Sequence, residues 1–121
     1  MYDFSFDEEG KILRVSLSGF LSEAEASTYF ADQELYSAEA RGRYGRLALL
    51  VDRTRCAVLS QGISEEVRHR REAAIKSPAD RIALVTSSSL VKMQILRTRE
   101  SEQIQVFDTV AEAREWLLSC K

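Results

Sequence analysis

The chain has 121 residues, of which 45% are hydrophobic and 30% are charged, and its formal net charge is −2 at pH 7. This length fits a single domain, 1–121, and the composition is not that of a disordered chain. Because the charges nearly balance and the longest apolar run, 47–51, is far shorter than a membrane span, we expect no nucleic-acid partner and no membrane insertion.

Cysteine and histidine are too scarce for a standard metal site. Cys56 and Cys120 form no CxxC pair, and His69 is the single histidine. We expect no metal and no cofactor, and two reduced thiols, with a disulfide between them as the alternative. Residues 1–7 lack the apolar run of a signal peptide, which favours a cytoplasmic location.

Two alternating stretches open the chain. Apolar and polar residues alternate over 2–7 and again over 12–17, with the polar turn 8–10 between them. A period of two is typical of half-buried strands, and the short turn predicts an antiparallel hairpin.

A helix is expected from Ser22 to about Arg41. Ser22 and Glu25 fit a capping box, and Gly42 and Gly45 are expected to end the helix. Its predicted inward stripe consists of Leu21, Ala24, Thr28, Ala31, Leu35 and Ala38.

Two short apolar runs, 47–51 and 82–85, predict parallel strands that are covered on both faces. Residues 53–59 are expected to connect the first of these strands to a helix, which begins at Ser60 or Ser64 and ends at Ser77-Pro78. The apolar stripe of this helix is thin and consists of Ile63, Val67 and Ala74, with Arg70 or Arg71 between them.

The last third of the chain predicts a serine-rich turn at 86–89, a helix at 90–99, a strand at 104–107 and a final helix. Asp108 or Thr109 caps the final helix. The order ββαβαβαβα predicts an α/β fold: a single mixed, mostly parallel five-stranded sheet with an N-terminal antiparallel hairpin and about four helices.

Four stretches in this order resemble the SpoIIAA-like group, which is related to the STAS domain. They are Leu17-Ser18-Gly19-Phe20-Leu21-Ser22, Arg46-Leu47-Ala48-Leu49-Leu50-Val51-Asp52, Asp80-Arg81-Ile82-Ala83-Leu84-Val85, and 106–117 from Val106-Phe107-Asp108 to Trp116-Leu117. The resemblance implies strands in roughly sequential order and a fold shared with lipid-binding CRAL-TRIO domains.

The resemblance also implies a regulatory serine. In regulatory STAS proteins a partner kinase phosphorylates the serine of an Asp-Ser-x-Gly motif at the start of a helix. This chain has Val58-Leu59-Ser60-Gln61-Gly62, which keeps the serine and the glycine but lacks the acidic residue. Ser60 is therefore a candidate phospho-regulatory residue, and a plain helix N-cap is the alternative.

Polar residues follow both buried strands and form candidate ligand-binding positions. Asp52 and Thr54 come after the first strand, and Ser87 and Ser88 after the second. The carboxyl ends of parallel strands often bind ligands, and backbone amides at a helix start can hold an anion. The alternative for all four residues is turn and cap chemistry.

We expect no enzyme. His69 falls in a helix with mixed charges, and the chain has no nucleophile elbow. The arginines near it are offset by glutamates and lack neighbouring aromatic residues, which weighs against nucleic-acid binding.

The third predicted helix is apolar around most of its circumference. Three explanations are open: burial in the core, contact with a protein partner or a second copy, or an apolar ligand pocket. The residues concerned are Leu90, Val91, Met93, Ile95 and Leu96. The sequence therefore favours a non-catalytic STAS-like regulatory or protein-interaction module, for which a homodimer is one form of contact. The alternative is binding of a small apolar or lipid-like ligand between the sheet and this helix.

Overall fold

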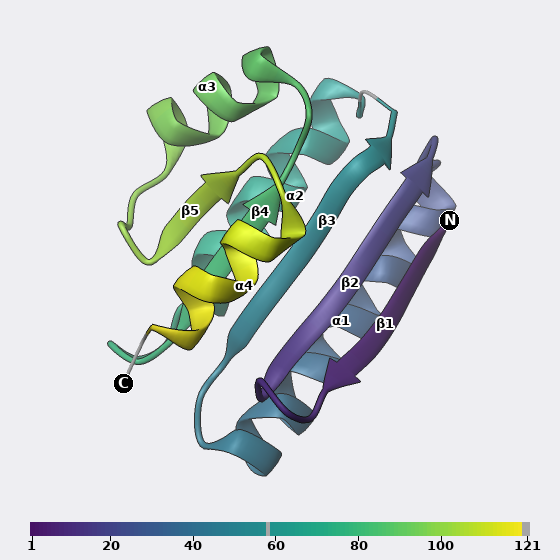
Figure 1. Ribbon diagram of the computed structural model, residues 1–121. Helices are drawn as coiled ribbons and strands as arrows, with labels where there is room; N and C mark the ends of the chain where they lie inside the picture. Colours follow the sequence, from purple (N-terminus) through teal and green to yellow (C-terminus); the bar gives the residue numbers. More distant parts are fainter. Residues whose placement is uncertain (58, 120–121) are drawn as a thin grey trace.

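Five strands and four helices make up the part of the chain that the computed structural model describes, residues 1–57 and 59–119 (Figure 1). The strands are β1 (Tyr2–Asp7), β2 (Ile12–Gly19), β3 (Ala48–Cys56), β4 (Arg81–Val85) and β5 (Ile104–Phe107). The helices are α1 (Glu23–Tyr44), α2 (Gln61–Ala74), α3 (Ser89–Thr98) and α4 (Val110–Leu118).

All five strands belong to one sheet, in the order β1-β2-β3-β4-β5. β1 and β2 pair in antiparallel fashion, and every other neighbouring pair is parallel. Ala48 pairs with Arg81 and Asp52 pairs with Val85, so the two apolar runs are adjacent strands that point the same way. The predicted fold, a single mixed and mostly parallel sheet with an opening hairpin and four helices, is confirmed.

The helices cover the sheet in two layers. Successive side chains of a strand point to opposite faces. Leu49 and Val51 belong to the larger core beneath α1, α2 and α3, whereas Ala48 and Leu50 belong to a smaller core beneath α4. In Figure 1, α4 crosses in front of the sheet, while α1 and α2 lie behind it. Right-handed connections between sequential parallel strands place the first three helices on the same face.

α1 ends three residues later than the predicted Arg41, and Gly45, one of the two glycines expected to end it, is its C-cap. The helix runs through Gly42 to Tyr44, and Gly45 ends it in the left-handed region with φ 77°. A glycine inside a helix costs roughly 1 kcal/mol relative to alanine, so it does not by itself stop one. The last turn is stabilised instead by the hydroxyl of Tyr44, which donates a hydrogen bond to Glu8 at 2.9 Å.

The predicted inward stripe of α1 is wrong, except for Leu21, which is buried ahead of the helix. Leu35 is 70% exposed, and the other members of the stripe, Ala24, Thr28, Ala31 and Ala38, are exposed as well. The residues that the helix buries are Ala26, Tyr29, Phe30 and Ala40. An alanine-rich helix offers several faces of similar hydrophobicity, and the large aromatic side chains decide which face is buried.

β3 is longer, and α2 shorter, than predicted. Residues 53–56 extend β3 because they pair with the end of β2, where Arg55 lies opposite Ser18. α2 begins after Ser60, one of the two predicted caps, and ends at Ala74 rather than at Ser77-Pro78.

Side-chain caps begin the helices as the sequence predicted. The Ser22 hydroxyl accepts a hydrogen bond from the backbone N–H of Glu25 at 3.2 Å, and the Thr109 hydroxyl accepts one from Glu112 at 3.2 Å. Each cap satisfies a backbone donor that the first helical turn leaves free, which typically contributes about 1 kcal/mol.

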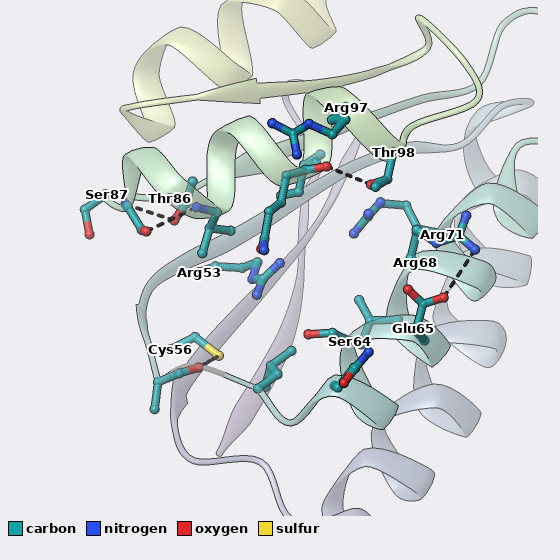
Figure 2. Close-up of a pocket in the computed structure, with 18 of the residues that line it drawn as sticks. Arg53, Cys56, Ser64, Glu65, Arg68, Arg71, Thr86, Ser87, Arg97 and Thr98 are labelled. Carbon is teal, nitrogen blue, oxygen red and sulfur yellow. Dashed lines mark hydrogen bonds and ion pairs between the residues drawn. The ribbon is translucent and has the colours of Figure 1, made fainter.

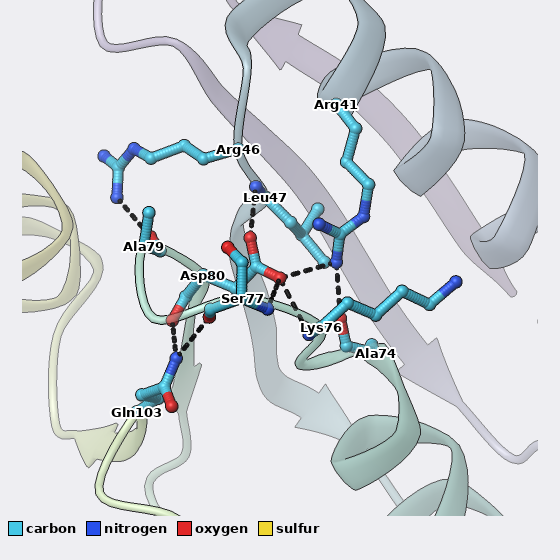
Figure 3. Close-up of polar contacts among 9 residues, drawn as sticks. All are labelled: Arg41, Arg46, Leu47, Ala74, Lys76, Ser77, Ala79, Asp80 and Gln103. Atoms are coloured by element: carbon cyan, nitrogen blue, oxygen red, sulfur yellow. Dashed lines mark hydrogen bonds and ion pairs between the residues drawn. The ribbon is translucent and has the colours of Figure 1, made fainter.

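A buried carboxylate fixes the amino ends of β3 and β4 (Figure 3). Asp80 is 0% exposed, and it accepts hydrogen bonds from the backbone N–H groups of Leu47 at 3.0 Å, Lys76 at 2.8 Å and Ser77 at 3.0 Å. The guanidinium of Arg41 lies 2.7 Å from the same carboxylate. Burial alone would raise the pKa of Asp80, but these hydrogen bonds and the charge of Arg41 lower it to about 2. The chain that follows α2 is thereby joined to the start of both central strands.

Candidate functional site

A cleft of about 560 Å³ lies at the opposite end of β3 and β4, where these strands terminate (Figure 2). Its walls come from the end of β3, from α2, from the turn after β4 and from α3. The volume is within the range of roughly 300–1,000 Å³ that is usual for small-molecule sites. The described lining residues are Arg53, Thr54, Cys56, Ala57, Leu59, Gln61, Ser64, Glu65, Val67, Arg68, Arg71, Thr86, Ser87, Ser88, Val91, Gln94, Ile95, Arg97 and Thr98.

The end of β3 delivers Arg53 to the cleft. Arg53 continues the face of β3 that carries Leu49 and Val51, and it comes where this face leaves the buried core. Asp52 points its carboxylate back at the chain, because its Oδ1 accepts hydrogen bonds from Thr54 N at 3.0 Å and Thr54 Oγ1 at 2.7 Å. Of the two predicted residues here, Thr54 lines the cleft, and Asp52 holds the local turn of the strand.

The most unusual residue of the cleft is Arg71, in the last turn of α2. Arg71 is 6% exposed, and within the described residues its Nε atom has no hydrogen-bond partner. Burial and then the positive charge of Arg53 lower the pKa of Arg71 to about 10. The guanidinium therefore stays protonated at neutral pH. Figure 2 shows Arg53 and Arg71 reaching into the space between α2 and α3.

Positive charge exceeds negative charge in the lining. Arg53, Arg68, Arg71 and Arg97 all line the cleft, and Glu65 is the one carboxylate among its described lining residues. Glu65 lies 3.4 Å from Arg68 in an ion pair on α2. Beneath them, burial raises the pKa of the Tyr29 phenol, while the charges of Arg53 and Arg71 oppose that rise.

The turn between β4 and α3 contributes hydroxyl groups and the amino end of α3 to the cleft. Thr86 is buried, and its hydroxyl accepts a hydrogen bond from Ser88 N at 3.2 Å. The Ser88 hydroxyl caps α3 by accepting from Val91 N at 3.2 Å. Ser87 and Ser88 both line the cleft, so the structure brings this predicted pair together with Thr54.

α3 has two different faces. Val91 and Ile95 line the cleft, and Ile95 is buried. Leu90, Met93 and Leu96 are 67%, 58% and 39% exposed, so the domain does not bury the helix on more than one side. Burial in the core is therefore confirmed for Ile95 and is wrong for Leu90, Met93 and Leu96. α3 lies at the edge of its helix layer, and nothing in the described part of the chain covers its outer face.

The other predicted residues lie around the cleft. Ser60 is exposed, and its hydroxyl caps α2 by accepting from Ile63 N at 3.3 Å. Cys56 is half-buried, lines the cleft as a free thiol and donates a hydrogen bond to the Ala57 carbonyl at 3.3 Å. Cys120 lies outside the described residues, so its relation to Cys56 remains a prediction.

The space between the sheet and α3 is the cleft itself, and its lining is both apolar and polar, so binding of a small apolar ligand there stays a prediction. A second, apolar cavity beneath the cleft, between Tyr29, Leu59 and Val67, has a volume of only about 20 Å³. This is close to the space that a single water molecule needs. The cleft is lined by arginines and hydroxyl groups together with the apolar side chains of Leu59, Val67, Val91 and Ile95.

Comparisons with known proteins give no indication of function, so the function is inferred from the cleft. No family model, no curated protein and no solved structure matches this chain. Within residues 1–57 and 59–119 no helix has the length and hydropathy needed to cross a bilayer. The same part of the chain has no group of three or more His, Cys, Asp or Glu side chains arranged to hold a metal ion.

Sequence reasoning missed Arg53 and Arg97 as site residues. It treated Arg68 and Arg71 only as charges offset by glutamates. One signal was present, because the thin stripe of α2 requires Arg70 or Arg71 between Val67 and Ala74. An arginine in an apolar stripe has its charge in or beside the core. Arg53 carried no such signal, since residues 53–59 were predicted to be a connection and the structure places Arg53 within β3.

Proposed function

We propose that this protein is a non-catalytic, STAS-like regulatory module that binds a small ligand in the cleft and presents α3 to a protein partner. The observation that carries the proposal is the division of α3 into two faces. Val91 and Ile95 line the cleft, while Leu90, Met93 and Leu96 point outward with apolar side chains. A ligand in the cleft contacts the same helix that a partner contacts from outside.

The chemistry of the cleft suits binding better than catalysis. Arginine remains protonated near neutral pH and cannot act as a general base there. Glu65 is engaged with Arg68, and the thiol of Cys56 hydrogen-bonds to the backbone. Hydroxyl and amide groups make up much of the remaining lining, and these groups orient a ligand.

The outer face of α3 supports the regulatory part of the proposal. Large apolar side chains that are more than half exposed, such as Leu90 and Met93, favour contact with another protein when they lie together on one helix. The resemblance to STAS modules, which act through protein contacts, agrees with this role. The occupant of this face is a partner protein or a second copy of the chain.

Native mass spectrometry of the purified protein tests the proposal, because it reports bound small molecules and oligomeric state together. We expect a ligand adduct that disappears when Ser64→Trp fills the cleft and persists in His69→Trp, a change on an exposed position of the same helix. We also expect Leu90→Gln with Met93→Gln to abolish association with a copurified protein or a second copy. A wild-type protein with neither a ligand adduct nor α3-dependent association would contradict the proposal.

A further inference from the structure

The buried guanidinium of Arg71 is the feature of the molecule that most needs an explanation. A charged group inside a protein is normally paired and fully hydrogen-bonded, because removing it from water is costly. Arg71 is 6% exposed, and its Nε atom has no partner in the described residues. Its neighbour Arg70, by contrast, pairs with Glu34 at 3.0 Å and Glu66 at 2.9 Å. Glu66, on the same helix, therefore pairs with the more exposed Arg70 and not with the buried Arg71.

A second arginine makes the position of Arg71 less favourable still. Arg53 approaches from β3, and its charge lowers the pKa of Arg71, while the charge of Glu72 opposes this with a smaller effect. Two like charges that face the same space repel each other unless a counter-charge lies between them. The cleft in front of both residues is where such a counter-charge has room.

The amino ends of α2 and α3 also favour an anion in the cleft. Gln61 and Ser64, in the first turn of α2, line one side, and Ser88, the cap of α3, lines the other. Helix amino ends carry partial positive charge and free N–H donors, which favour anions. Neither α2 nor α3 has an acidic residue in its first turn to neutralise this end.

We propose that the cleft binds the phosphate group of a small, hydrophilic phosphate monoester, with Arg71 and Arg53 as the main phosphate ligands. This inference rests on the ligand-binding function proposed above and names the class of ligand. A phosphate monoester carries a charge of about −1.5 to −2 at pH 7 and offers three acceptor oxygens, which matches two guanidinium groups for which the described residues provide no ion-pair partner.

The remaining lining residues define the rest of the ligand. Hydroxyl and amide side chains that face the cleft are Thr54, Gln61, Ser64, Ser87, Gln94 and Thr98. These groups fit a body that carries hydroxyl groups, and the apolar side chains of Leu59, Val67, Val91 and Ile95 can contact its carbon atoms. The described lining contains no aromatic side chain, so a nucleobase would find no stacking surface. The apolar cavity of about 20 Å³ beneath the cleft leaves no room for an acyl chain.

Isothermal titration calorimetry with inorganic phosphate and with glycerol phosphate tests the proposal, in a buffer without phosphate and at constant ionic strength. We expect both probes to bind the wild-type protein and uncharged glycerol not to bind. Arg71→Met and Arg53→Met should each weaken phosphate binding by about 10-fold or more, since a charge-assisted hydrogen bond is stronger than a neutral one. Arg70→Met changes the same charge on the same helix outside this cleft, and it should leave the affinity within about 2-fold.

A second measurement keeps the test valid if a variant is hard to fold. Phosphate should raise the unfolding temperature of the wild-type protein and of Arg70→Met, because a ligand that binds only the folded state stabilises it. Arg71→Met should unfold at a higher temperature than the wild-type protein without phosphate, and phosphate should raise its unfolding temperature much less. If Arg71 had a purely structural role, its replacement would not both raise the unfolding temperature and reduce the response to phosphate.

Three results would overturn the inference. One is equal phosphate affinity in Arg71→Met, Arg53→Met and Arg70→Met, which would indicate unspecific attraction to surface charge. Another is tighter binding to vesicles of phosphatidylcholine and phosphatidic acid than to glycerol phosphate, which would assign the site to a lipid headgroup. The third is no phosphate binding at millimolar concentrations. If native mass spectrometry then still shows a ligand in the cleft, the proposed function stands and only the ligand class is wrong; if it shows none, both fail.

Discussion

Two buried charges lie at opposite ends of the same pair of strands, and their surroundings differ completely. At the amino ends of β3 and β4, Asp80 accepts three backbone hydrogen bonds and an ion pair from Arg41 (Figure 3). At the carboxyl ends, the Nε atom of Arg71 has no hydrogen-bond partner among residues 1–57 and 59–119, and Arg71 faces a second arginine, Arg53 (Figure 2). One charge is fully satisfied by the chain itself, and the other is not.

The difference separates a structural charge from a functional one. The hydrogen bonds at Asp80 lower its pKa, so the folded state favours the charged form and gains stability from it. Burial lowers the pKa of Arg71, so the folded state disfavours the charged form and loses stability. Titratable groups with perturbed pKa values are concentrated at functional sites, and this agrees with the phosphate ligand proposed for Arg71.

The largest expected effect is at Asp80. Asp80→Asn should lower the free energy of unfolding by about 3–4 kcal/mol, because it leaves the Arg41 charge unpaired and places an amide NH₂ among backbone donors. Urea denaturation followed by circular dichroism measures this. Asp108→Asn, at an exposed position, should change stability by less than about 0.5 kcal/mol. A loss as small as that of the control would show that Asp80 is not the anchor of this end.

Acid should remove the part of this contribution that depends on the charge of Asp80, without a mutation. The folded-state pKa of Asp80, about 2, lies below its ordinary value of 3.8. Its contribution is therefore complete above about pH 4 and is lost as the pH falls toward 2, in total about 2 kcal/mol. Unfolding free energies of the wild-type protein and Asp80→Asn should converge over this range. Parallel curves would contradict the assignment.

The opposite sign is expected at Arg71. Arg71→Met replaces a buried unpaired charge with an apolar side chain of similar length, and it should raise the free energy of unfolding by about 1–2 kcal/mol without ligand. Arg70→Met removes two partly exposed ion pairs, and it should lower stability by less than about 1 kcal/mol. If Arg71→Met destabilises the protein more than Arg70→Met, Arg71 has a satisfied role and the contrast with Asp80 disappears.

The smallest effect is the coupling between the two arginines of the cleft. Because the charge of Arg53 lowers the pKa of Arg71, Arg71→Met should stabilise the Arg53→Met background by less than it stabilises the wild-type protein. We expect a coupling free energy below about 1 kcal/mol in a double-mutant cycle, and a weaker one at high salt. Strict additivity would place the two guanidinium groups too far apart to bind one phosphate.

Local signals in the sequence were reliable where neighbours along the chain decide the structure. Period-two alternation predicted the hairpin, apolar runs predicted β3 and β4, and Ser22, Ser60 and Thr109 cap helices as expected. Capping and strand formation depend on residues a few positions apart, so the sequence contains most of the information about them.

Predictions that depend on distant partners were less reliable. The inward face of α1 was wrong because Phe4 of β1, far away in sequence, stacks against Tyr29 and Tyr36 and sets the rotation of the helix. The extension of β3 to Cys56 depends on pairing with Gly19. Asp80 was not recognised as a buried acid, since its donors come from Arg41, Leu47 and the end of α2.

The sequence by itself determined the order of elements, the mixed sheet and the positions of the helix caps, because hydrophobic period and capping chemistry act over a few residues. Only the tertiary structure decided that Arg53 and Arg71 share one cleft and that the outer face of α3 stays exposed. The stripe of α2 indicated an arginine at 70 or 71 beside the core, but the repulsion between Arg53 and Arg71 arises only when β3 and α2 bring the two residues together.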